Sequence, residues 1–113
     1  MATYFGFAIA DSMFPSVCRV ERVALSVADA ATEVAAGVTS CLNPSHTATI
    51  QALNVRCGIS VEIPPSAPRV SLQRGDSVIV MSPRGLPRLQ GRHEYTEEEI
   101  RAAEFAFGKW TVK

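Results

Sequence analysis

The spacing of apolar residues predicts two helices in the first half of the chain. Across residues 26–36 the apolar side chains recur at i, i+3, i+4 and i+7, which places them on one helical face. Ser26 stands in the capping position before this segment, and Gly37 follows it as a stop signal. Residues 45–57 form the second predicted helix, which follows an Asn-Pro start and has Gly58 where a left-handed cap is expected.

Five segments have the composition of β-strands, because they are rich in β-branched, aromatic and other apolar residues and lack clear helical spacing. They are Thr3–Ala10, Val17–Leu25, Val38–Leu42, Ser77–Ser82 and Phe105–Val112. The fourth, SVIVMS, is apolar almost throughout, which is typical of a central strand. Arg69–Gln73 is predicted to pair with it as a hairpin across the turn Arg74-Gly75-Asp76.

Two loops and a short helix complete the predicted elements. Ile63–Pro68 contains three prolines and cannot continue a sheet. Pro83–His93 has two prolines, two glycines and three arginines, which is typical of an exposed, functional loop. A capping box at Thr96 opens a helix that ends near Glu104. Helices and strands are mixed in order, so we expect one α+β domain over residues 1–113, with a mixed sheet of about five strands and flanking helices.

Length and composition agree with a single packed core. A chain of 113 residues fits one domain, and its 47% hydrophobic content is ordinary for a globular protein. The charged content of 19% is too low for a disordered chain. So short a chain leaves little material for a deep pocket of its own, so we expect a functional cleft to need a second copy.

The cysteines and the N-terminal segment favour a cytoplasmic protein. Cys18, Cys41 and Cys57 are odd in number and have no CxxC or CxxxC spacing, which indicates neither a disulfide framework nor a zinc site. We expect buried thiols in a reducing cytosol. The apolar run at residues 4–10 lacks a basic leader and is too short to span a membrane, so neither secretion nor a membrane partner is expected.

Charge argues against a binder of long nucleic acids. Eleven basic and eleven acidic residues cancel, so the chain lacks the overall positive field of non-specific DNA-binding proteins. Between Ile63 and His93, however, five arginines stand against one acidic residue: Arg69, Arg74, Arg84, Arg88, Arg92 and Asp76. The planar guanidinium suits bidentate contact with phosphate, although an Arg-rich codon usage would explain the same count.

His46 is the strongest candidate for chemistry. It lies in the first turn of the second predicted helix, where free backbone amides and the positive end of the helix dipole favour anions such as phosphate. Ser45, Thr47 and Thr49 add hydroxyl groups beside it. A lone histidine is more often structural than catalytic, and capping alone would explain Ser45 and Thr47.

Two arginines extend this candidate site. Arg84 follows the predicted central strand, at an edge where ligands of sheets often bind, and Arg69 begins the predicted neighbouring strand. Cations that hold a phosphate and an imidazole that moves a proton suit phosphoryl transfer. No nucleotide-binding loop, metal motif or serine elbow is present, so we expect metal-independent chemistry and no cofactor. His93 is expected in an exposed loop, and Trp110 in the core or an interface.

Five segments in their order resemble the small ring nucleases of archaeal viruses and phages, the type III anti-CRISPR family. They are YFGFAIADSMFP near the N-terminus, then SHTATIQALNVRCG, RVSL, GDSVIVMSPR and a closing FGKWTV. The resemblance spans nearly the whole chain. It is weak over residues 17–39 and best from His46 to Gly58.

The resemblance implies a small α+β protein that forms a two-fold homodimer and binds cyclic tetra-adenylate at the dimer interface. It also implies cleavage of this ring to linear di-adenylates, which disarms the effectors that the messenger activates. By resemblance, His46 is the general acid that protonates the leaving 5′ oxygen, and Arg84 stabilises charge in the transition state. Arg69 would hold the ligand and Thr49 would line the site. The expected ligand-binding set is Arg69, Thr49, Ser45, Thr47, Ser82 and Arg88.

The protonation of His46 follows from the same picture. A helix N-terminus lowers the pKa of a histidine, whereas a bound phosphate raises it. We therefore expect His46 to be protonated mainly in the complex.

The chain departs from the family's pattern at three places. Phe7 and Ala10 stand where the family commonly has an Asn and a Ser that touch the ligand. The acidic pair that follows the strand-end arginine is replaced by Leu86-Pro87-Arg88, and the loop Ile59–Pro68 is longer. A protein that sequesters a cyclic nucleotide without cutting it therefore stays open beside cleavage, as does a dimeric module that binds a protein. The sequence does not distinguish a viral from a cellular origin.

Overall fold

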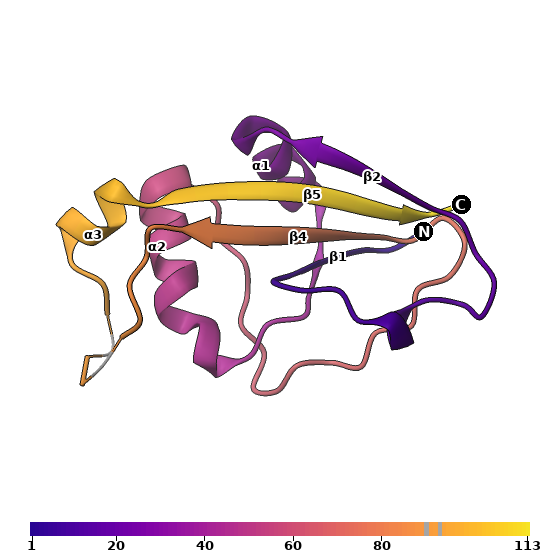
Figure 1. The fold of residues 1–113 in the computed structure, drawn as a ribbon, viewed down its shortest axis with the longest axis horizontal. Helices are drawn as coiled ribbons and strands as arrows, with labels where there is room; N and C mark the ends of the chain where they lie inside the picture. The colour runs from indigo at the N-terminus through magenta and orange to yellow at the C-terminus, as the bar shows by residue number, and fades with distance from the viewer. Residues whose placement is uncertain (90, 93) are drawn as a thin grey trace.

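The computed structural model describes residues 1–89, 91–92 and 94–113, and these residues form the α+β domain that the sequence predicts. Its strands are β1 (Thr3–Gly6), β2 (Val20–Leu25), β3 (Thr39–Ser40), β4 (Ser77–Arg84) and β5 (Glu104–Val112). Its helices are α1 (Val27–Ala36), α2 (Thr47–Cys57) and α3 (Glu97–Ala102), with single 3-10 turns at η1 (Asp11–Met13) and η2 (Pro44–His46). The two chain termini lie at one end of the molecule, and α2 and α3 lie at the other (Figure 1).

One mixed sheet holds all five strands in the order β2-β5-β4-β1-β3. β1 lies between β3 and β4 and runs parallel to both, while β5 runs antiparallel to β4 and β2. The carboxyl ends of β1, β3 and β4 therefore meet at one edge of the sheet. β4 is central, as its continuous apolar sequence predicts.

The predicted hairpin at Arg69–Gln73 is wrong. Both edges of β4 are already occupied by β1 and β5, so no edge is left for a hairpin partner. The segment lies across one face of the sheet instead, where Val70 and Leu72 are buried and the Leu72 amide donates to the Met13 carbonyl at 2.7 Å. The prediction rested on the turn Arg74-Gly75-Asp76, and a turn does not by itself decide whether the segment before it joins the sheet. The turn before β4 is present, with Gly75 at φ +93°.

The helix signals were sound, while several strands are shorter than predicted. Ser26 caps α1 by accepting from the Asp29 amide at 3.1 Å, and Gly58 ends α2 in the left-handed conformation. The capping box of α3 is present at Thr96. β1 ends at Gly6 rather than at Ala10, and β3 keeps two residues of the predicted Val38–Leu42.

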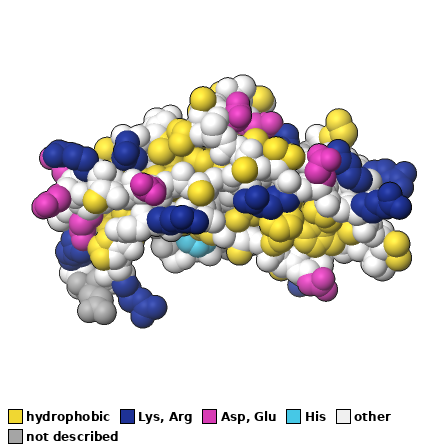
Figure 2. Space-filling view, turned by 45° about the horizontal axis from the view of Figure 1, so that its top comes forward, with side chains coloured by type: hydrophobic (Ala, Val, Ile, Leu, Met, Phe, Trp, Pro, Cys, Tyr) yellow, Lys and Arg dark blue, Asp and Glu magenta, His cyan; other side chains and the backbone are white. Residues whose placement is uncertain are grey.

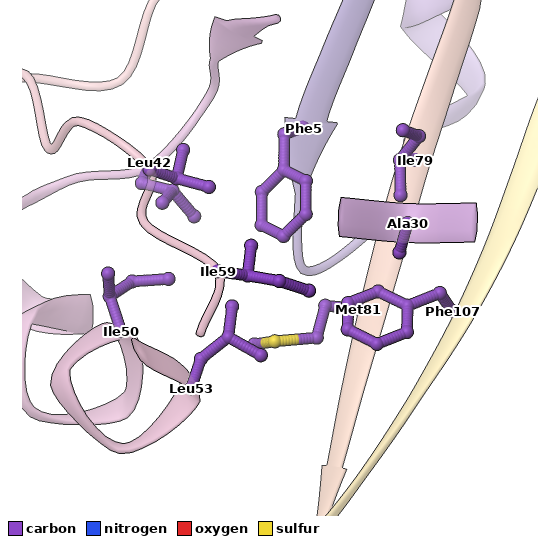
Figure 3. Packing of buried hydrophobic residues seen from close by; sticks show 10 residues of the cluster. Phe5, Ala30, Leu42, Ile50, Leu53, Ile59, Ile79, Met81 and Phe107 are labelled. Atoms are coloured by element: carbon purple, nitrogen blue, oxygen red, sulfur yellow. The ribbon is translucent and has the colours of Figure 1, made fainter. Parts of the chain in front are cut away.

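The main core lies between one face of the sheet and the helices α1 and α2. Figure 3 shows Leu53 of α2 and Ile59 pointing toward Met81 and Phe5 of the sheet. Ile59 is buried although it belongs to no helix or strand, so the loop Ile59–Pro68 begins by packing on the core. Ala30 is the buried residue of α1.

A second cluster lies on the opposite face of the sheet, because successive residues of a strand point to opposite faces. Val78 and Val112 of the strands are buried there beneath Val70 and Leu72. Within the described ranges, no helix has the length and apolar character needed to cross a membrane.

Candidate functional site

A hollow of about 380 Å³ lies at the edge where the parallel strands end. Its lining residues come from the segments that follow or end β1 and β4 and from the start of α2, which follows β3: Phe7, His46, Thr49, Met81, Ser82 and Pro83. The carboxyl ends of parallel strands are a common place for ligands in sheets flanked by helices. Three of these six residues, His46, Thr49 and Ser82, are in the predicted site.

The turn η2 fixes the His46 ring. Pro44 begins the turn, and the Asn43 side chain caps it by accepting from the Ser45 amide at 2.9 Å. In return, Nδ1 of His46 accepts from the Asn43 amide at 3.2 Å. An Nδ1 that accepts carries no hydrogen, so the neutral ring has its proton on Nε2. Nε2 is therefore the nitrogen available to a ligand.

Phe7 packs against the imidazole of His46, whose pKa is lowered by burial. The two rings meet edge to face, with centroids 4.3 Å apart and planes at 67°. Burial lowers the pKa of His46 below its usual value of 6.5. The hydrogen bond from Asn43 acts in the same direction, because a protonated Nδ1 cannot accept it. The expected direction is thus found, but desolvation rather than the helix end is its main cause.

Ser45 and Thr47 serve the turn. The Ser45 hydroxyl donates to Oδ1 of Asn43, and the Thr47 hydroxyl donates to the Pro44 carbonyl at 2.7 Å. Neither residue lines the hollow. The structural alternative of capping therefore accounts for both hydroxyls, whereas Thr49 and Ser82 line the hollow.

Arg84 lies just beyond the hollow. It ends β4 two residues after Ser82, so both side chains leave the same face of the sheet. Its register partner on β5 is Glu104. Side chains directly opposite each other on antiparallel strands are about 5 Å apart at Cβ, so this carboxylate is within reach of the guanidinium.

The other arginines do not gather into one patch. Arg74 precedes β4 and Arg84 ends it, and a strand of eight residues spans roughly 25 Å. Arg92 forms a bidentate ion pair with Glu99 of α3, in which its two terminal nitrogens donate to the two carboxylate oxygens at 2.7 and 2.9 Å. Arg69 and Arg88 are exposed and do not line the hollow. Figure 2 accordingly shows Lys and Arg side chains along the whole length of the face it views.

Several features of the site were not predictable from local motifs. Met81 and Pro83 line the hollow beside Phe7, and Glu104 is placed opposite Arg84 only by the strand register. No three His, Cys, Asp or Glu residues come together to hold a metal ion among the residues that the structure describes. His93 lies outside the described residues.

Comparison with known proteins gives a likeness of fold. No protein-family model matches the sequence, and no curated protein matches it. Among solved structures, the chain is similar to B116 of Sulfolobus turreted icosahedral virus, with a TM-score of 0.73. The sequence identity is 15%, and the match covers 98% of this chain and 99% of that one. The chain thus has, over almost its whole length, the fold of a small protein of an archaeal virus.

Proposed function

We propose that this protein is a metal-independent ring nuclease that binds cyclic tetra-adenylate and cuts it into linear di-adenylates. One observation carries the proposal: His46, whose Nε2 has no hydrogen-bond partner among the described residues, lines a hollow together with Thr49 and Ser82, and Arg84 ends the same strand as Ser82. A proton donor and a cation are groups that assist the cleavage of a phosphodiester. The resemblance of the sequence to the anti-CRISPR ring nucleases supports this substrate.

The proposed reaction uses the ligand's own nucleophile. A 2′-hydroxyl attacks the adjacent phosphorus, the bond from phosphorus to the 5′ oxygen breaks, and the 2′-hydroxyl proton passes to solvent. His46 gives a proton from Nε2 to the leaving 5′ oxygen, and Arg84 balances the charge that gathers on the phosphoryl oxygens. Each cut leaves a 2′,3′-cyclic phosphate and a 5′-hydroxyl, so two cuts yield two di-adenylates.

We propose that the working form is a two-fold homodimer. A hollow of about 380 Å³ is at the small end of the range of about 300–1,000 Å³ for drug-sized ligands. A ring of four nucleotides needs a larger binding surface than this hollow provides. Two-fold symmetry supplies two copies of His46 and Arg84 to a ring that is itself symmetric. The expected outcome by light scattering is a dimer, and a monomer at micromolar concentration would contradict it.

Sequestration without cleavage is the second candidate. In the free protein the imidazole is held neutral by burial and by the Asn43 amide, and residues 86–88 lack the acidic pair that the resembled family has after its strand-end arginine. A protein of this kind would bind the ring and leave it intact. Either activity would lower the messenger that drives type III CRISPR effectors, and we place both in the cytoplasm, that of the host if the protein is viral.

The deciding experiment combines a cleavage assay with a binding assay. Labelled cyclic tetra-adenylate is incubated with the protein in EDTA, the products are resolved, and calorimetry measures binding in parallel. Di-adenylates with a 2′,3′-cyclic phosphate would support the ring nuclease. Binding with the ring intact would replace it with sequestration, and neither binding nor cleavage would reject both.

A further inference from the structure

A second, smaller hollow lies on the face of the sheet that the helices leave free. Its volume is about 120 Å³. It is lined by residues of β2, β4 and β5: Arg22, Val80, Ser82, Ala106, Phe107, Gly108 and Trp110. Ser82 also lines the hollow that contains His46, so this residue is common to both linings.

Gly108 allows Arg22 to lie flat against the sheet. Arg22 is the register partner of Trp110, and its guanidinium carbon is 5.9 Å from the centre of the indole ring. A Cβ at Gly108 would come within 3.0 Å of Nε and Nη2 of Arg22. The guanidinium thus covers the bare backbone of β5 beside a half-buried indole.

The charge of Arg22 is available to a ligand. The Arg22 side chain is exposed, and among the residues that the structure describes no carboxylate forms an ion pair with it. Arg84 leaves the same face of the sheet two residues beyond Ser82. The small hollow therefore combines a planar cation, an aromatic plane and a hydroxyl, with a second cation near its edge.

These groups match a nucleotide better than a second copy of the chain. Nucleobases stack on aromatic rings and on guanidinium planes, and a guanidinium also binds phosphate in a fork. A two-fold contact centred on this face would instead place Arg22 against Arg22, and the hollow contains no carboxylate to offset the repulsion.

We propose that Arg22 and Trp110 form a nucleobase subsite, which holds one adenine of the ligand against the indole and guanidinium while the neighbouring phosphate lies beside His46. This inference rests on the proposed function, because it assigns a place to part of the same ligand. Val80 and Ala106 form the apolar floor of the subsite.

Trp110 is the single tryptophan of the chain, so its fluorescence reports on this subsite alone. The ring is mixed with wild-type protein in EDTA in a stopped-flow instrument, and calorimetry on His46→Ala measures affinity without cleavage. We expect the Trp110 emission to change on mixing. In the His46→Ala background, Arg22→Ala should weaken the Kd on the order of tenfold, as loss of one stacking partner does. Arg22→Lys, which keeps the charge but loses the plane, should also bind more weakly.

The matched control is Arg19→Ala, which removes an equal charge from an exposed position just before β2. It should bind as the parent does. Binding by calorimetry with unchanged Trp110 emission and an unchanged Kd for Arg22→Ala would overturn the subsite and leave the proposed function standing. If the Trp110 emission changed with protein concentration but not with added ligand, the subsite would be overturned, and a contact with a second copy of the chain would replace it. Absence of any binding would reject the proposed function itself.

Discussion

Replacing His46 by alanine separates its structural from its chemical contribution. The variant loses the acceptor for the Asn43 amide, a bond worth about 1 kcal/mol, and the edge-to-face contact with Phe7, worth about 1 kcal/mol. A total near 2 kcal/mol is well within the stability of about 5–15 kcal/mol that is usual for a domain. The variant should therefore fold.

The catalytic loss should be larger than the structural one. Removal of a general acid slows a reaction by roughly 10²- to 10⁴-fold, which is about 3–5 kcal/mol of transition-state stabilisation. The assay is single-turnover cleavage of cyclic tetra-adenylate in EDTA, with urea unfolding to show that the variant is folded. Gln51→Ala, an exposed change on the same helix, is the control and should cut normally. A folded His46→Ala that cuts within threefold of the parent would refute the assignment.

Three further predictions test protonation and packing. Single-turnover cleavage should slow as pH rises above the pKa of His46 in the complex, and a flat pH profile would contradict its role as an acid. Asp76→Ala should lose about 2–4 kcal/mol in urea unfolding, because the carboxylate accepts from two backbone amides at 2.8 and 2.9 Å, and Asp76→Asn should lose less. Those bonds lower the pKa of Asp76 below 3.8, so its contribution is present above that pH and is lost as pH falls through the folded pKa; a loss under 0.5 kcal/mol for the alanine variant would contradict this account. Leu53→Ala should cost about 2–5 kcal/mol because its side chain is fully buried, whereas Val55→Ala, 69% exposed, should change unfolding little; equal effects would contradict the core.

Local signals in the sequence were enough to predict the helices and the central strand of this fold. Caps at Ser26, Gly58 and Thr96 depend on hydrogen bonds within a few residues, so a short stretch of sequence specifies them. The apolar character of SVIVMS likewise identified the central strand. The pairing of strands is different, because it depends on which edges are still free. That is why the turn before β4 was predicted correctly but the pairing of Arg69–Gln73 was not.

The residues of the candidate site likewise fall into those that local sequence predicts and those that depend on strand pairing. His46 and Thr49 are close in sequence and share the start of α2, so their proximity was predictable. Ser82 joins them only because β4 lies beside β1. Glu104 lies opposite Arg84 because of the register between β4 and β5, which the spacing of residues in the sequence does not predict. A comparison of sequences finds a carboxylate only where it follows the strand-end arginine along the chain. It does not find Glu104, which the sheet places opposite Arg84 from the next strand.

In the proposed reaction, cutting and holding the ring would differ by one proton on His46. In the free protein, Phe7 and the Asn43 amide both favour the neutral imidazole, which cannot act as a strong acid. The same apolar wall strengthens the attraction between a phosphate and an imidazolium, since water is excluded from the side that Phe7 covers. A phosphodiester at Nε2 would therefore raise the pKa more in this hollow than on an open surface. Under the proposed function, Phe7, which stands where the resembled family commonly has a polar residue, would thus couple protonation to binding. A ring whose phosphate lies at Nε2 would be cut, and one whose phosphates lie elsewhere would be held intact.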